Sequence, residues 1–177
     1  MRSLSTPFRA AVALIALCLS AQVTLAVPWG ATTIPFSLQS LAVFLIGWYL
    51  PVRWSAVVVL AYLLLGTLGL PVFADGESGW SVLRGGSGGF LQGFFWSVVF
   101  LGIWKYYRPA TRHRAPLGFL LATIVLFAFG LLHLTVLYDF SRAVAYGLAP
   151  FWVVALLKVG VLWLITVGYA HLVGRFA

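Results

Sequence analysis

Charged side chains are scarce in this sequence, and acidic ones are the scarcest. Only 8% of the 177 residues are charged, with three Asp and Glu residues against 11 Lys and Arg residues. A soluble domain carries roughly 25% charged residues, so this chain has too few to cover a surface that faces water. The three acids also lie between the apolar segments, which leaves no pair of carboxylates for acid–base catalysis inside one of them.

Cysteine is almost absent as well. Cys18 is the only cysteine, which excludes an internal disulfide, a CxxC redox pair and a cysteine-based zinc site. His133 and His171 have no second histidine or carboxylate at ligand spacing, so we expect no metal site. A P-loop and a dinucleotide-binding fingerprint are also missing. These absences favour a protein that recognises a ligand over an enzyme, and they predict no cofactor.

Long hydrophobic runs take up most of the chain, of which 63% is hydrophobic. A membrane-spanning helix needs about 20 predominantly apolar residues, and prolines fall at or near the breaks between runs. The pattern predicts helices over residues 8–26, 37–50, 53–68, 88–107, 117–137 and 148–173. We therefore predict an all-α integral membrane protein with six transmembrane helices in a single domain, residues 1–177.

The first apolar run has a second interpretation. Residues 8–26 follow Arg2 and contain Arg9, and the run ends in Thr-Leu-Ala, which is also typical of a secretory signal peptide. A signal peptide usually precedes a soluble exported chain, whereas five more membrane segments follow here. We therefore predict that this helix is not cleaved.

The positions of the cations predict the orientation. With the N-terminus in the cytoplasm, eight of the 11 Lys and Arg residues lie on the inner side, two on the outer side, and Lys158 within a helix. The inner set is Arg2, Arg9, Arg53, Lys105, Arg108, Arg112, Arg114 and Arg175, and the outer set is Arg84 and Arg142. The positive-inside rule therefore predicts a multi-pass protein of the cell (inner) membrane with both termini cytoplasmic. Because the cations are spread between apolar segments, the net charge of +8 does not indicate nucleic-acid binding.

Lys158 is the charged residue whose insertion into a membrane would cost the most free energy. It lies about ten residues into the helix predicted over 148–173, which is about 15 Å along the helix axis. A lysine at the centre of a membrane helix costs about 2.5–3.5 kcal/mol and is a functional candidate by default. The alternative is a lysine that extends along its own stem to the interface. The depth favours a role in a polar cavity or with an anionic ligand.

Two outer segments hold further candidates. One contains Asp75, Glu77, Trp80 and Arg84, followed by glycine-rich residues 85–89 at the start of a helix. Such glycines let backbone N–H groups approach an anion, although Gly85, Gly89, Gly93 and Ser97 also form a small-residue stripe that suits helix packing. In the other segment, the Gln39 amide can donate and accept hydrogen bonds. It serves equally well to satisfy loose backbone groups.

The order of four motifs resembles that of one family. Residues 34–39 resemble a Pro-x-x-Leu-Gln signature, and residues 62–73 resemble a Leu-Leu-Gly-x-x-Gly-Leu-Pro-Val-Phe block. Residues 85–90 resemble a Gly-Pro-Ser/Thr-Gly-Gly-Tyr segment, and Pro150-Phe151 with Lys158 resembles a Pro-Phe…Asp-x-x-Lys ending. Together they resemble the BioY family, the biotin-specific S components of energy-coupling-factor (ECF) transporters.

The resemblance implies a six-helix S component that captures biotin outside the cell and supports its uptake across the cytoplasmic membrane. It implies membrane lipid around the chain and, as partners, a transmembrane coupling subunit and two ATP-binding subunits. A homo-oligomer is the alternative if no such subunits are present. The implied ligand-binding residues are Gln39, Tyr62, Phe73, Glu77, Trp80, Arg84, Gly88, Phe90, Asp139 and Lys158.

The chemistry of biotin suits these residues. Its carboxylate pairs with a cation, for which Lys158 and Arg84 are candidates. Its ureido ring needs donors and acceptors, which Gln39, Glu77 and Asp75 offer. Its apolar parts need aromatic and aliphatic walls, which would come from Tyr62, Phe73, Trp80 and Phe90.

Three positions depart from the family pattern. Ala155 stands where the family has an aspartate, Gly86 where it has a proline, and Phe90 where it has a tyrosine. We hypothesise that Asp139 or Glu77 replaces the missing aspartate. The departures leave open an S component for another small anionic vitamin. A membrane-embedded lipid-modifying enzyme would need convergent carboxylates or a metal, and an assembly partner would leave Lys158 unexplained.

Overall fold

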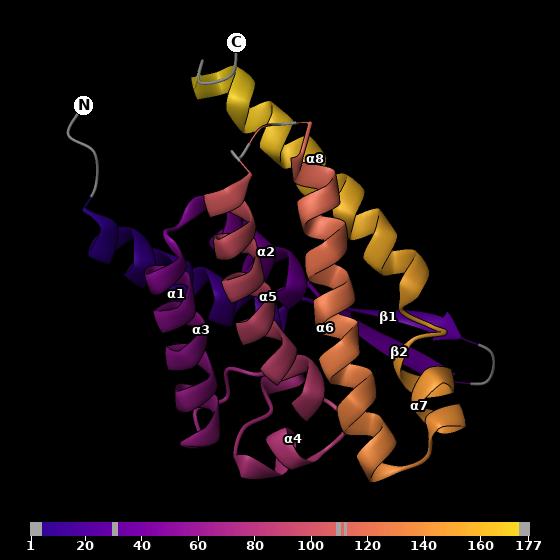
Figure 1. Cartoon of the computed structure of the whole chain (residues 1–177). Coiled ribbons are helices and arrows are strands. Elements are labelled where there is room, and N and C mark those ends of the chain that lie inside the picture. Colours follow the sequence, from indigo (N-terminus) through magenta and orange to yellow (C-terminus); the bar gives the residue numbers. More distant parts are fainter. Residues whose placement is uncertain (1–4, 30–31, 109–110, 112, 174–177) are drawn as a thin grey trace.

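The fold is predominantly helical. The computed structural model describes residues 5–29, 32–108, 111 and 113–173. Its long helices form a bundle from which a β-hairpin projects to one side (Figure 1). The elements in chain order are α1 (Thr6–Gln22), β1 (Thr24–Trp29), β2 (Thr32–Ser37), α2 (Gln39–Tyr49), α3 (Val52–Thr67), the 3-10 turn η1 (Ala74–Gly76), α4 (Trp80–Arg84), α5 (Gly88–Tyr107), α6 (Ala115–Leu137), α7 (Phe140–Gly147) and α8 (Trp152–Val173).

Each predicted helical segment overlaps one of the helices α1, α2, α3, α5, α6 and α8, with shifts at the ends. The range 88–107 coincides with α5, and 53–68 differs from α3 by one residue at each end. The range 8–26 is too long, because α1 ends at Gln22 and the chain then enters β1. The range 148–173 starts too early, because α8 begins at Trp152, after Pro150. These shifts move Lys158 nearer to the start of its helix.

The hairpin between α1 and α2 was not anticipated from the sequence. Strands β1 and β2 pair antiparallel, with Thr24 opposite Ser37 and Trp29 opposite Thr32. Pro28 and Pro35 lie within these strands, where they exclude a helix interior and are tolerated because a two-stranded hairpin consists of edge strands. The sequence pattern assigned residues 24–26 to the first helix and residues 27–36 to a connection, whereas the strands extend from Thr24 to Trp29 and from Thr32 to Ser37. As a result, α2 has only 11 residues.

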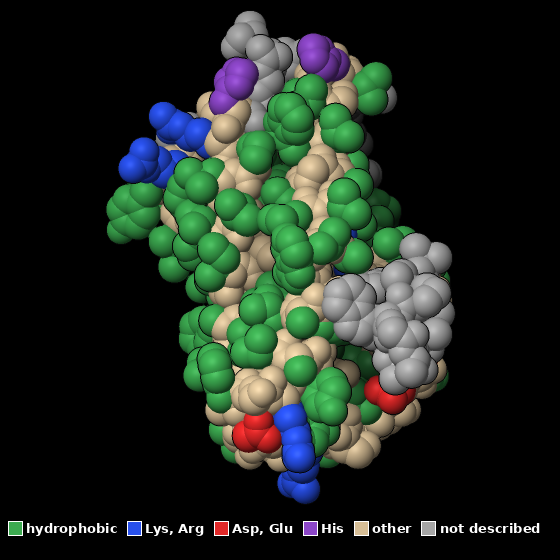
Figure 2. Space-filling model, turned by 90° about the vertical axis from the view of Figure 1, so that its right-hand side faces the viewer, with side chains coloured by type: hydrophobic (Ala, Val, Ile, Leu, Met, Phe, Trp, Pro, Cys, Tyr) green, Lys and Arg blue, Asp and Glu red, His purple; other side chains and the backbone are tan. Residues whose placement is uncertain are grey.

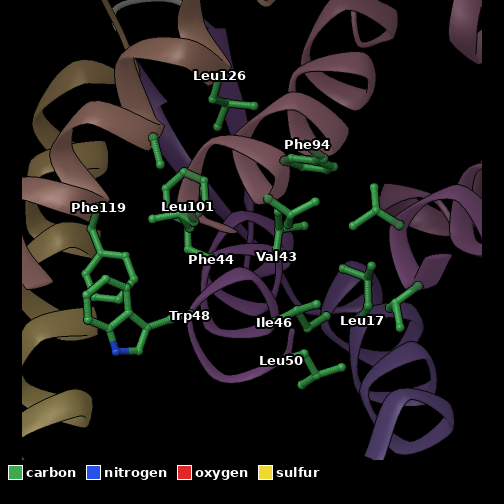
Figure 3. Close-up of a cluster of buried hydrophobic side chains, with 14 of the residues drawn as sticks. Leu17, Val43, Phe44, Ile46, Trp48, Leu50, Phe94, Leu101, Phe119 and Leu126 are labelled. Carbon is green, nitrogen blue, oxygen red and sulfur yellow. The ribbon is translucent and has the colours of Figure 1, made fainter. Parts of the chain in front are cut away.

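The core lies around α5, which packs against α2, α3 and α6. Leu17, Val43, Leu101 and Phe119 are among the buried side chains that fill the space between these helices (Figure 3). The small-residue stripe of α5 faces α6. A Cβ atom on Gly93 would lie 2.9 Å from the Leu126 carbonyl oxygen, and the Ser97 hydroxyl donates to the Ala122 carbonyl at 3.0 Å. Larger residues would force α5 and α6 apart.

Cations from two other helices bind the C-terminal end of α2. The last carbonyls of a helix have no partner within it, and Pro51 prevents the chain from continuing as a helix. Lys105 Nζ donates to the carbonyls of Trp48 and Leu50, at 2.9 and 2.8 Å. Arg9 donates to the Tyr49 carbonyl at 3.2 Å. These bonds hold the tight turn between α2 and α3.

Apolar side chains cover the outside of the bundle. In the described residues, Ala115–Leu137 and Trp152–Leu172 are long and apolar enough to cross a membrane. Val136 and Leu172 are 85% and 87% exposed, and hydrophobic side chains cover most of the lateral face in Figure 2. A water-soluble monomer rarely exposes such a continuous apolar surface. This surface suits a protein surrounded by lipid.

One glycine makes room for an aromatic ring. Phe73, in the segment after α3, is 1% exposed, and its ring packs edge-on against Tyr62 with centroids 5.5 Å apart. The ring lies against Gly66, where an added Cβ atom would overlap the ring atoms of Phe73. Gly66 therefore fixes the position of Phe73 relative to α3.

We predict that Gly66→Ala destabilises the protein by about 1–3 kcal/mol, the usual cost of overpacking a core. The measurement is the thermal unfolding midpoint in detergent. Gly160→Ala is the matched control, because a Cβ atom at Gly160 of α8 meets no atom within 4 Å. Equal midpoints for the two variants would contradict this account of the Gly66–Phe73 contact.

Candidate ligand-binding site

A cavity of about 520 Å³ opens between the helices. This volume lies within the range of sites that bury small molecules. The exposed residues Asp75 and Glu77 lie at its rim, and the buried residue Gln39 lies deeper. The other lining residues come from β2, α2, α4, α5, α6, α7, α8 and the segments that connect them, so distant parts of the chain meet here. The cavity occupies space beyond the start of the short helix α2.

Phenylalanines form much of the wall. Phe90 of α5 packs edge-on against Phe127 of α6, with centroids 6.0 Å apart, and contacts Phe151 at 6.3 Å. The Phe90 ring also lies against Gly130, where a Cβ atom would overlap it. Phe44 and Phe94 line the cavity further along. This wall suits the aliphatic and ring carbons of a ligand.

Lys158 of α8 brings a positive charge to the cavity. Its Nζ donates to the Ser37 carbonyl at 2.8 Å and to the Ser40 hydroxyl at 3.0 Å. An ammonium group has three N–H donors, so one remains for a ligand. Across the described part of the chain, no Asp or Glu lies within ion-pair distance of Lys158. A half-buried cation without a carboxylate favours an anionic ligand, because an opposite charge offsets the cost of its burial.

Gln39, at the start of α2, supplies neutral polar groups. Its side-chain oxygen accepts a hydrogen bond from the Ser37 hydroxyl at 2.8 Å, and its Nε2 donates to the hydroxyl of Tyr62. Both partners are hydroxyl groups, which can donate or accept, so they hold the amide in place in either of its two orientations. An amide has two N–H groups and two lone pairs, so one of each remains. Gln39 can therefore both donate to and accept from a bound molecule.

The rim is tied to the end of α1. Thr24 Oγ1 donates to Asp75 at 2.7 Å, and Gln22 Nε2 donates to the carbonyls of Pro71 and Phe73. Asp75 has a φ of 56°, and Asp is one of the few residues other than glycine that adopt this conformation readily. These contacts hold the segment after α3 against α1 at one side of the cavity.

The structure brings together five of the residues predicted from the sequence. Gln39, Phe73, Glu77, Phe90 and Lys158 all line the cavity, as does Asp75. Two others lie behind the lining, since Tyr62 is fully buried and bonds Gln39, and Gly88 is buried against Leu83 and His133.

Three predicted residues lie outside the cavity. Trp80 and Arg84 of α4 face a separate groove. Asp139 is the N-cap of α7, where it accepts a hydrogen bond from the Arg142 backbone N–H at 2.9 Å and pairs with the Arg142 side chain at 3.4 Å. Sequence position indicates at which end of the bundle a residue lies, but not toward which side a five-residue helix or a helix cap points.

Sequence reasoning also missed several lining residues. Ser40 directly follows a motif that was recognised and Phe151 belongs to another, so both positions carried a usable signal. Phe44, Thr123 and Phe127 lie within uniformly apolar helices, where no sequence signal distinguishes them. Ala155 lines the same wall as Lys158, three residues earlier on α8. A carboxylate at that position would be a neighbour of the lysine on the helix surface.

Comparison with known proteins relates both the sequence and the fold to one family. A model of the BioY family matches residues 2–175. The biotin transporter BioY of Thermotoga maritima is 32% identical over 119 residues, which cover 67% of this chain and 70% of that protein. The biotin transporter BioY2 of Lactococcus lactis is 49% identical over 70 residues, which cover 40% of this chain and 37% of that protein.

The fold has a solved counterpart. The crystal structure of an S-component for biotin from an ECF-type ABC transporter superposes with a TM-score of 0.71, covers 91% of this chain and 90% of its own, and is 19% identical in sequence. At that identity the likeness concerns the fold, and the family match supplies the relationship. The chain belongs to the BioY family, whose members are substrate-binding components of transporters and not enzymes.

Proposed function

We propose that this chain captures biotin as the S component of an ECF-type vitamin transporter and supports its uptake into the cell. Two curated relatives are named biotin transporters, and the similar fold belongs to an S-component for biotin. The proposal rests on the environment of Lys158. This cation lies in a cavity with phenylalanine walls, and none of the described carboxylates pairs with it. A small acid with an apolar body complements both features.

In the bound state, the biotin carboxylate accepts the remaining N–H of Lys158. The thiophane ring and the valeryl chain lie against Phe90, Phe94 and the neighbouring apolar side chains. The ureido group bonds the free donor and acceptor of Gln39 or the carboxylate of Glu77. Asp139 takes no part in this arrangement, which leaves Glu77 as the candidate to replace the family aspartate.

Ala155 favours this role for Lys158. An aspartate there could pair with the lysine and neutralise it before a ligand arrives. With alanine, the ammonium bonds only neutral oxygen atoms, those of Ser37 and Ser40. The ligand must then supply the negative charge. The same reasoning admits another small anionic vitamin as the second candidate, and competition between unlabelled vitamins separates the two.

We further propose six membrane crossings, by α1, α2, α3, α5, α6 and α8, in the inner membrane with both termini cytoplasmic. Arg9 and Lys105 lie together at the inner end of α2, whereas Asp75, Glu77 and Asp139 belong to the connections at the opposite end. On the face that Figure 2 shows, the acidic side chains lie toward the lower end. Arg2, Arg112 and Arg175, which also support this orientation, lie outside the described residues.

The exposed face of α1 is available to a partner. Val12, Ile15 and Leu19 are each at least half exposed on it. We assign this face to lipid or to the coupling subunit that, with two ATP-binding subunits, would supply the energy. A homo-oligomer is the alternative if those subunits are lacking.

The orientation predicts a labelling pattern. In a Cys18→Ser background we introduce Phe140→Cys or Tyr106→Cys, two positions that are 69% and 84% exposed at opposite ends of the bundle. A membrane-impermeant maleimide should label the first variant in intact spheroplasts and the second only after permeabilisation. The reverse pattern would show that the orientation is inverted, and labelling of both in intact spheroplasts would contradict six crossings.

Equilibrium binding to Lys158→Met tests the function. We expect biotin affinity to fall at least about tenfold, the loss that corresponds to one hydrogen bond to a charged group. Biotin amide, which lacks the carboxylate charge, should bind the variant and the original protein almost equally. Arg142→Gln is the control, since it removes a cation that lies outside the cavity.

Each outcome has a distinct meaning. If the variant loses as much affinity for biotin amide as for biotin, Lys158 contacts the ureido group and not the carboxylate. Unchanged biotin affinity would remove Lys158 from the site. If the original protein is folded and binds no biotin, the vitamin is a different one.

A further inference from the structure

A second hollow lies on the outside of the bundle and shares no lining residue with the cavity. Helices α3, α4, α5 and α6 all contribute to it. Its lining residues are Leu63, Trp80, Leu83, Arg84, Gln92, His133 and Leu137. Leucines from three helices provide its apolar surface, and the polar groups are an arginine, an amide and an imidazole. We call it the α4 groove.

The polar groups of the α4 groove are largely unpaired. Arg84 and Gln92 are exposed, and in the ranges that the structure describes neither has a hydrogen bond or an ion pair. His133 Nε2 donates to the Gly85 carbonyl at 3.0 Å, which leaves Nδ1 of a neutral ring free. By contrast, Arg142 at the same end of the molecule is paired with Asp139. The α4 groove thus has a cation that no acidic side chain neutralises.

The depth of these groups matches the border between lipid headgroups and acyl chains. Gln92 lies four residues into α5, and His133 lies four residues before the end of α6. At 1.5 Å per residue, both are about 6 Å inside the ends of their helices. Trp80 is 65% exposed, and exposed indoles concentrate at membrane interfaces. An exposed glutamine at this depth would otherwise face acyl chains without a partner.

We propose that the α4 groove binds an anionic phospholipid. The phosphate lies at Arg84, the Gln92 amide donates to an ester carbonyl, and an acyl chain lies over Leu63, Leu83 and Leu137. The described lining contains no Asp or Glu to pair with a choline or ethanolamine ammonium, so charge favours a lipid with a net negative headgroup. The orientation proposed above assigns this lipid to the outer leaflet, but the binding itself depends neither on that assignment nor on biotin.

Trp80 offers a local readout. The delipidated protein in neutral detergent is titrated with phosphatidylglycerol that carries brominated acyl chains, which quench nearby tryptophans. The difference between the original protein and Trp80→Phe isolates the quenching of Trp80. We expect saturable quenching by phosphatidylglycerol and roughly tenfold weaker quenching after Arg84→Gln, as for the loss of one hydrogen bond to a charged group.

The controls decide between a site and general charge attraction. Arg142→Gln, with the same change in net charge, should titrate like the original protein, and Arg84→Lys should keep part of the affinity. Equal quenching by brominated phosphatidylcholine, or equal weakening by Arg142→Gln and Arg84→Gln, would overturn the proposal. Inorganic phosphate and glycerol phosphate are added as competitors. If either displaces the lipid at millimolar concentration, the groove is a site for free phosphate.

Discussion

In the six-crossing arrangement proposed above, helix α2 is too short to cross the hydrocarbon core by itself, and the backbone at its outer end has to find partners within the protein. Eleven residues rise about 16 Å, whereas the hydrocarbon core is about 30 Å thick. At such a depth every backbone polar group must be satisfied by the protein or face a water-filled space. Strand β2 pairs with β1, and Lys158 donates to the Ser37 carbonyl where β2 meets α2. The cavity exists because no helix continues into the space beyond Gln39.

Lys105 of α5 and Lys158 of α8 both donate to backbone carbonyls near the ends of α2, but the two lysines have different roles. Lys105 donates to two carbonyls at the inner end of α2, those of Trp48 and Leu50. Lys158 donates to one carbonyl and one hydroxyl at the outer end and also borders the cavity. The first charge stabilises a turn. The second is held in place by its bonds and keeps a donor for a ligand, since an ammonium has three.

The sequence was a good guide to the helices and a partial guide to the site. The apolar runs and the prolines between them predicted the limits of α5. The position of Lys158 deep in an apolar helix indicated a functional residue. The hairpin was not predicted because its residues were read as a connection between two helices, and its strands lack the strict alternation of apolar and polar residues that indicates a strand. Trp80, Arg84 and Asp139 lie at the same end of the bundle as the cavity but do not line it, and the sequence could not indicate this because α4 and the cap of α7 are too short to carry a periodic pattern. Phe127 was missed because every side of α6 is apolar.

The cavity walls are supported from behind, which bears on how tightly a ligand can bind. Phe73 packs on Gly66 and Phe90 packs on Gly130, so neither ring has space to move away from the cavity. The rim is joined to β1 by the hydrogen bond between Thr24 and Asp75 and to the end of α1 by the side chain of Gln22. Binding loses less free energy when the site is ordered before the ligand arrives. A preformed cavity in which the Lys158 ammonium bonds neutral oxygen atoms therefore lets the carboxylate of a bound acid contribute to affinity with little cost for rearrangement.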